Sequence, residues 1–164
     1  MKHRVFIAIN LPEGVKKKLA SHKDKWPELP ARWTKEDNLH ITLEFLGYVS
    51  DEEILEILKT AKEMASKHAS FEVKLNKICY GPPGKIPPRM IWAIGDKINE
   101  FNTVPHITLA RIQTWQWKQI EPEERPEVNE DINLSFEVNS IEVMESALSR
   151  GGPKYTMLES FPLN

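Results

Sequence analysis

The tetrapeptide His-Ile-Thr-Leu occurs twice in the chain, at positions 40–43 and 106–109, and it constrains the fold more than any other feature. Both copies alternate apolar and polar residues and contain β-branched side chains, which predicts two strands. The first strand is expected to place Ile41, Leu43 and Phe45 on one face and His40, Thr42 and Glu44 on the other. In the second, His106, Thr108 and Ala110 are expected to oppose Ile107 and Leu109. Side chains two apart on a strand stand about 6.5–7 Å from each other. Two such strands in one sheet would line a cleft with two imidazoles and two hydroxyls.

The rest of the chain predicts an α+β fold with a largely antiparallel sheet. Alternating apolar residues indicate further strands near positions 5–9, 71–75, 90–94, 134–143 and 155–161. One helix is predicted from Pro12 to about Trp26, and a second from Ser50, where Ser50 and Glu53 form a capping box, to about Lys67. We expect one domain that spans residues 1–164, because this length can bury a substantial core.

Composition restricts the classes of function. The formal net charge is −2, and the fractions of hydrophobic (40%) and charged (28%) residues are those of an ordinary globular protein. No apolar run reaches the roughly 18 residues of a membrane span, and the apolar residues 5–9 are too few for a signal peptide, so we expect a cytoplasmic protein. The charge argues against long contacts along a nucleic acid, which need clustered cations. The same charge is compatible with binding a single phosphate at the end of a nucleic-acid strand.

Two imidazoles across a cleft can divide acid–base work, because one can take a proton from a nucleophile while the other gives a proton to a leaving group. The two threonine hydroxyls could donate to the non-bridging oxygens of a phosphate ester. A 2′,3′-cyclic phosphate is the natural substrate class, because its strained ring needs only an activated water and a protonated leaving oxygen. The competing interpretation of a single His-x-Thr segment is structural, but the repetition places polar residues on the same face both times.

Other site chemistries fit the sequence less well. No His-x-His or His-x-x-x-His pair is present, and Cys79 is the only cysteine, so we predict no metal ligands and no metal or other cofactor. No Gly-x-Ser-x-Gly turn indicates a serine hydrolase. A different class stays open, which is a module that binds an RNA end or a nucleotide phosphate in the same cleft without turnover.

The two motifs and their flanks, at positions 6–12, 38–47, 105–111 and 145–155, resemble the bacterial and archaeal RNA 2′,3′-cyclic phosphodiesterases of the 2H phosphoesterase superfamily, formerly called 2′-5′ RNA ligases. The resemblance implies a two-lobed fold with pseudo-twofold symmetry and a central cleft. It also implies hydrolysis to a 2′-phosphate without metal or ATP, with 2′-5′ ligation as the reverse reaction. Its expected substrates are RNA ends or tRNA fragments that carry a 2′,3′-cyclic phosphate and small cyclic nucleotides, and its expected state is a monomer.

Site residues follow from the same resemblance. His106 would activate the water, His40 would protonate the departing 3′-oxygen, and Thr42 and Thr108 would hold phosphate oxygens. Arg111 could add charge at the phosphate, although strict alternation puts it on the face of Ile107 and requires a bulge or the strand end; a surface salt bridge is the alternative. Phe6 and Tyr155 could stack on a base, and Phe6 also suits core packing.

Two segments carry further expectations. Relatives in this family usually place a helix before the second motif, where this chain has only residues 95–105. Loss of that helix would expose Ile91 and Ala93, so we expect a segment to be missing from the sequence. Trp115 and Trp117 are expected on one face, primarily for packing between the lobes.

Overall fold

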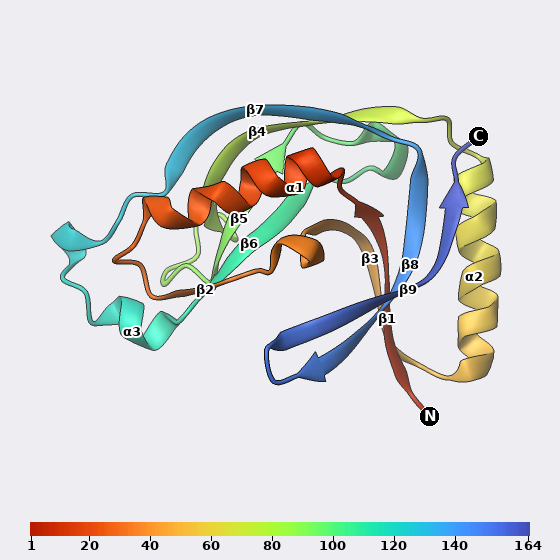
Figure 1. Cartoon of the computed structure of the whole chain (residues 1–164), viewed down its shortest axis with the longest axis horizontal. Coiled ribbons are helices and arrows are strands. Elements are labelled where there is room, and N and C mark those ends of the chain that lie inside the picture. Colours follow the sequence, from red (N-terminus) through yellow and green to blue (C-terminus); the bar gives the residue numbers. More distant parts are fainter.

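The computed structural model describes residues 1–164 and contains two antiparallel sheets (Figure 1). The first sheet has the strand order β3 (His40–Val49), β1 (His3–Asn10), β8 (Ser140–Ser149) and β9 (Gly152–Pro162). The second has the order β2 (Ala31–Trp33), β6 (His106–Ile112), β5 (Met90–Gly95), β4 (Phe71–Gly81) and β7 (Asn129–Val138). The predicted α+β class with antiparallel sheets is confirmed, and the two motif strands lie in different sheets rather than in one.

Each sheet is covered by one helix (Figure 1). Helix α1 (Glu13–Ala20) continues into a 3₁₀ turn, η1 (Ser21–Lys25), and lies over β5 and β6, whereas α2 (Asp51–Ser66) packs on the other sheet. The Ser50 hydroxyl accepts the Glu53 backbone N–H, which confirms the predicted helix start. The remaining short elements are α3 (Thr114–Lys118), η2 (Glu36–Asn38), η3 (Asn99–Phe101) and η4 (Pro122–Glu124). No helix combines the length and hydropathy needed to span a bilayer.

Two apolar clusters hold the sheets and helices together. The larger joins α1 to the second sheet, and the smaller joins α2 to the first. The motif strands contribute Ile41 and Ile107, both at most 1% exposed, to the larger cluster. Burying a side chain of this size stabilises the fold by about 1.5–3 kcal/mol. The buried isoleucines therefore anchor the motif strands so that the flanking His and Thr side chains face outward.

The short connection before the second motif differs from the expectation. Ile91 and Ala93 are fully buried, in a cluster that includes Leu19 of α1 and Ile98 of the connection itself. Because β5 and β6 are adjacent antiparallel strands, a short link closed by the Ile98–Thr103 bridge suffices, and no crossover helix is required. The short connection therefore leaves Ile91 and Ala93 covered, which removes the reason for expecting a missing segment.

The two tryptophans after the second motif do not share a face. They lie on α3, where residues two apart point in nearly opposite directions. Trp117 is 7% exposed and packs in the larger cluster with the Arg125 guanidinium over its ring, whereas Trp115 is 71% exposed. The prediction of one shared face is therefore wrong, because a short helix replaces the extended backbone that it assumed.

Candidate active site

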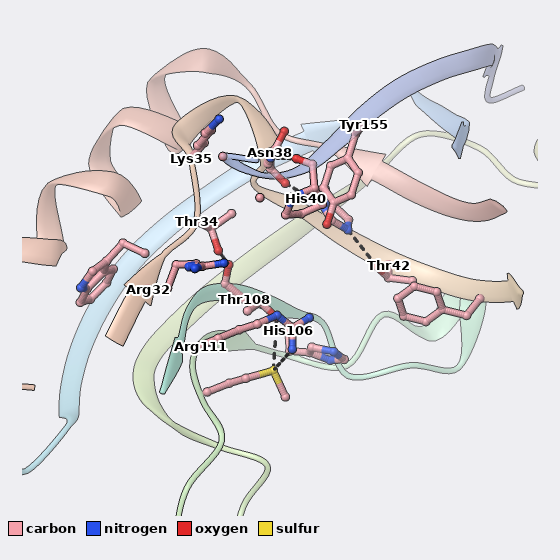
Figure 2. Close-up of a pocket in the computed structure, with 16 residues that line it drawn as sticks. Arg32, Thr34, Lys35, Asn38, His40, Thr42, His106, Thr108, Arg111 and Tyr155 are labelled. Carbon is pink, nitrogen blue, oxygen red and sulfur yellow. Dashed lines mark hydrogen bonds between the residues drawn. The ribbon is translucent and has the colours of Figure 1, made fainter. Parts of the chain in front are cut away.

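A cavity of about 310 Å³ lies where the two sheets meet, and both motifs open onto it (Figure 2). His40 and Thr42 enter from β3 of the first sheet, and His106 and Thr108 enter from β6 of the second. The sequence predicted two imidazole and hydroxyl pairs around one cleft, and the structure brings these four side chains together. The volume is within the range of small-ligand sites.

The first motif strand has a bulge directly after its threonine. In the pairing with β1, Thr42 stands opposite Ala8 and Glu44 opposite Ile7, so Leu43 is an extra residue. The bulge reverses the alternation, and Phe45 therefore lines the cavity with His40 instead of sharing the face of Ile41. Leu43 packs with Ile41 as predicted, and the predicted faces are wrong from Glu44 onward. The ring of Phe45 is 64% exposed at the cavity wall.

The second motif strand repeats the bulge at the corresponding residue. Trp92 of β5 stands opposite Thr108, and Ile91 stands opposite Ala110, which leaves Leu109 unpaired. The bulge turns Arg111 into the cavity. Arg111 forms no salt bridge; the sulfur of Met90 lies 3.9 Å from its Nη1. The bulge that Arg111 needed is present, and the alternative of a surface salt bridge is not realised.

His40 is held in one tautomer by its own strand entry. Its Nδ1 donates to the Asn38 carbonyl over 2.7 Å, because a carbonyl can only accept, so Nε2 is the nitrogen available for proton transfer. Nε2 lies 2.9 Å from Thr42 Oγ1. The ring packs against Phe6 and meets Tyr155 edge-on, with ring centroids 5.1 and 5.2 Å away. These contacts fix both the orientation and the tautomer of the imidazole.

His106 has a different support. It stacks on Trp92, with ring centroids 4.3 Å apart. A Cβ on Gly81 would lie 2.3 Å from the Trp92 ring, so this glycine allows the indole to lie under the histidine. Thr108 Oγ1 donates only to the Met90 sulfur, over 3.8 Å, and a ligand oxygen could replace this weak acceptor.

Burial lowers the pKa of both histidines below the ordinary value of 6.5. For His40, the positive charges of Lys16 and of His106 lower the pKa further, while the hydrogen bond to Asn38 opposes the shift. The backbone carbonyl of Val104 likewise opposes the effect of burial on the pKa of His106. Both rings are therefore neutral at pH 7, and an anion in the cavity would favour protonation of either ring.

Of the two aromatic residues predicted to stack on a base, one lines the cavity and the other is buried beneath it. Tyr155 is partly exposed and lines the cavity, and burial raises the pKa of its hydroxyl, so it stays protonated. Phe6 is 2% exposed and does not line the cavity. It lies beneath the rings of His40 and Tyr155, so the expectation that Phe6 stacks on a base does not fit its burial. Core packing, the other role expected of Phe6, fits.

Several cavity and supporting residues were missed. Arg32 and Lys35 line the cavity, and buried Lys16 donates to the Asp37 carbonyl behind His40. Phe45 had one available signal, because it occupies the position of its motif that Arg111 occupies in the other. Arg32 and Lys35 had none, because only the pairing of β2 with β6 brings them to the site.

Two sheets that meet at a cavity with paired imidazoles and hydroxyls, surrounded by cations, define a class of site suited to acid–base chemistry on an anionic ester. Comparison with known proteins agrees with this class. The family model described as LigT-like phosphoesterase matches residues 9–92, which is half of the chain. The chain belongs to the LigT-like phosphoesterase family, and it is an enzyme of that class.

Curated relatives and solved structures resemble the whole chain. Proteins named RNA 2′,3′-cyclic phosphodiesterase from Aquifex aeolicus and Methanocaldococcus jannaschii are 28% and 27% identical. These alignments cover 83% and 96% of this chain and 84% and 99% of the relatives. A crystal structure of a Thermus thermophilus protein superposes with a TM-score of 0.83 at 26% identity, covering 98% of this chain and 97% of that one. Escherichia coli LigT complexed with phosphate gives 0.77 at 26%, covering 99% and 98%.

Proposed function

We propose that this protein is an RNA 2′,3′-cyclic phosphodiesterase that opens the cyclic phosphate at an RNA end, or in a small cyclic nucleotide, to a 2′-phosphate. The observation that carries the proposal is the convergence of His40, Thr42, His106 and Thr108 on one cavity. The shared name of the curated relatives supplies the substrate class. Ligation to a 2′-5′ linkage would break the same bond from phosphorus to the 3′-oxygen, with the 5′-hydroxyl of a second RNA end as the nucleophile in place of water.

In the proposed reaction, His106 takes a proton from water as the water oxygen attacks phosphorus. The bond from phosphorus to the 3′-oxygen breaks, and protonated His40 gives its Nε2 proton to that oxygen. Exchange with solvent then returns one proton from His106 and restores the proton on His40. Thr42 and Thr108 donate hydrogen bonds to the non-bridging oxygens, where charge is greatest in the transition state. Every step uses this chain's own side chains.

The repeated bulge also bears on organisation. We propose that residues 1–164 form a single domain of two pseudo-symmetric lobes, one built around each motif. Support comes from the extra residue at Leu43 and at Leu109, the same position of both motifs.

The test is hydrolysis of adenosine 2′,3′-cyclic phosphate in buffer that contains a chelator, with the product identified by phosphorus NMR. The expected product is the 2′-phosphate alone, and His40→Gln or His106→Gln should each abolish its formation. Lys17→Gln, on the exposed side of α1, serves as a control of folding and handling. Tight binding of the substrate without turnover would instead assign the protein as a phosphate-binding module, and formation of the 3′-phosphate would contradict the proposed leaving group.

A further inference from the structure

The cavity is surrounded by positive charge and contains no acid. Its lining includes Arg32, Lys35 and Arg111, and none of the sixteen lining residues is Asp or Glu (Figure 2). The chain as a whole carries 24 acidic and 22 basic residues, so the cavity differs sharply from the average surface. Such segregation focuses a positive potential on the cavity and favours an anionic ligand.

Two of these cations face each other across a strand pair. In the pairing of β2 with β6, Arg32 stands directly opposite Arg111. Like charges in directly opposed positions repel, and no carboxylate lies within salt-bridge distance of either guanidinium. An anion between or beside the two side chains would relieve this repulsion. The unpaired arginines therefore indicate that β2 contributes to ligand binding as well as to the fold.

The third cation reaches across the mouth of the cavity. Lys35 lies between β2 and η2, and its Nζ is 2.9 Å from the point that a Cβ on Gly151 would occupy, in the hairpin between β8 and β9. The same hairpin is held by a hydrogen bond from Asn38 Nδ2 to the Pro153 carbonyl, 3.0 Å long. Lys35 is exposed and has no carboxylate partner. Its ammonium is thus placed at the rim by two segments that are distant in sequence.

Binding of the reacting phosphate does not account for all three cations around the cavity. Thr42, Thr108 and both imidazoles already surround its proposed position, and Arg111 is on the same strand as His106. Arg32 lies one strand further from this centre, a spacing of about 4.8 Å. Figure 2 shows Arg32 and Lys35 on the Thr34 side of the cavity, away from Thr42 and Tyr155. An RNA end offers a second phosphate at a comparable separation, because one ribose joins successive phosphates.

We propose that Arg32 and Lys35 form a subsite for the phosphate on the 5′-oxygen of the nucleoside whose cyclic phosphate reacts. This inference rests on the proposed function and extends it to substrate choice. It makes the enzyme selective for RNA ends, in which every terminal nucleoside carries such a phosphate, over free nucleoside cyclic phosphates. Arg111, between the two positions, contacts the reacting phosphate.

Three substrates separate the contributions of phosphate and base. Adenosine 2′,3′-cyclic phosphate lacks the 5′-phosphate, its 5′-phosphorylated form adds only that group, and the cyclic-phosphate-ended dinucleotide ApA adds the group together with a second nucleoside. The readout is the ratio of kcat/KM for each longer substrate to that for the first. We expect both ratios to be about ten, the gain of two solvent-exposed charge contacts. The double variant R32Q/K35Q should bring both ratios close to one.

The matched control is K17Q/K18Q, which removes two exposed charges from α1, outside the cavity lining, and should keep both ratios. If the kcat/KM ratios of R32Q/K35Q equalled those of the unaltered protein, the proposed subsite would be overturned. An equal loss in the double variant and in the control would also overturn it, because general attraction of anions does not need a particular pair of cations. A gain for the dinucleotide without a gain for the 5′-phosphorylated form would assign the selectivity to the second base and overturn the proposal as well.

Binding of reaction products tests the subsite without turnover. Adenosine 2′,5′-bisphosphate should bind about tenfold more tightly than adenosine 2′-phosphate by calorimetry, and R32Q/K35Q should remove the difference. If no cyclic phosphate is opened but this difference is found and lost as expected, the proposed hydrolysis fails while the subsite stands. Equal affinities for the two products in the unaltered protein would overturn the subsite even if hydrolysis is observed.

Discussion

The two His-Ile-Thr-Leu strands have the same backbone device and different surroundings. Each has one extra residue directly after its threonine, Leu43 in β3 and Leu109 in β6, and each bulge turns a later side chain into the cavity. In one strand this side chain is Phe45, and in the other it is Arg111. The bulge therefore fixes where a side chain points, while the sequence at that position decides what it contributes.

The two imidazoles also have different neighbours. His40 packs against Phe6 and Tyr155 and is close to the charge of Lys16, whereas His106 stacks on the indole of Trp92. Burial lowers the pKa of both, but cations add to this effect only at His40. A repeated motif can thus carry two distinct chemical roles, because neighbours from other strands and helices set the charge and packing at each copy.

The largest expected effect tests whether the two histidines have different roles. His40→Ala and His106→Ala should each lower kcat by a factor of about 10²–10⁴, the range for loss of general acid–base catalysis. A substrate with sulfur in place of the 3′-oxygen needs little protonation of its leaving group, because a thiol is far more acidic than an alcohol. With this analogue His40→Ala should recover most of its rate, and His106→Ala should not. Equal recovery by both variants, or recovery by His106→Ala alone, would contradict the assignment.

A smaller effect is expected at the paired positions after the bulges. Arg111→Gln should lower kcat/KM by about tenfold to a hundredfold, because a hydrogen bond to a charged group contributes about 1.5–3 kcal/mol.

Phe45→Leu should raise KM by about fivefold, equivalent to about 1 kcal/mol of stacking on a base. The two effects separate with ribose 2′,3′-cyclic phosphate, which has no base: the loss in Arg111→Gln should persist and that in Phe45→Leu should disappear. Phe45→Tyr, which retains the stacking surface, is the control, and losses that do not depend on the base would refute the role of Phe45.

The motif residues could be predicted because their signal is local. Alternation and β-branched residues place His40 and Thr42 on one face over three residues, and the second copy repeats the pattern. The bulges could not be predicted, because an extra residue at Leu43 or Leu109 has no glycine or other sequence mark and depends on the register with a neighbouring strand. Every side chain after a bulge is consequently assigned to the wrong face.

Long-range pairing explains the other omissions. Arg32 belongs to the site only because β2 pairs with β6, and nothing in the residues around position 32 indicates that partner. Trp92 supports His106 only because it stands opposite Thr108 on β5. Ile91 is covered partly by Leu19 of α1, a residue far from it in the sequence. Local pattern thus predicts the reacting groups better than the residues that position and select the substrate.

The pH dependence of kcat/KM should show both lowered pKa values. The reactive free enzyme needs one histidine protonated and the other neutral, so the rate falls below the lower pKa and above the higher one. Both values lie below 6.5, which places the maximum of kcat/KM on the acid side of pH 6.5. The bound phosphate anion favours the imidazolium, so the profile of kcat should lie at higher pH than that of kcat/KM. A maximum of kcat/KM above pH 7, or a profile with a single limb, would contradict two-histidine chemistry.

The smallest expected effect isolates the one cation that distinguishes His40 from His106. Lys16 is 5% exposed, and its positive charge disfavours protonation of His40, so removing the charge should raise the pKa of His40. Lys16→Met keeps the apolar stem that packs in α1. The limb of the kcat/KM profile that titrates with His40 should therefore shift to higher pH, while the limb that titrates with His106 stays in place. Lys17→Met makes the same change on the exposed side of the helix and should shift neither limb. If Lys16→Met moved neither limb, or moved both limbs equally, the charge of Lys16 would not distinguish His40 from His106, and the asymmetry around the repeated motif would come from packing alone.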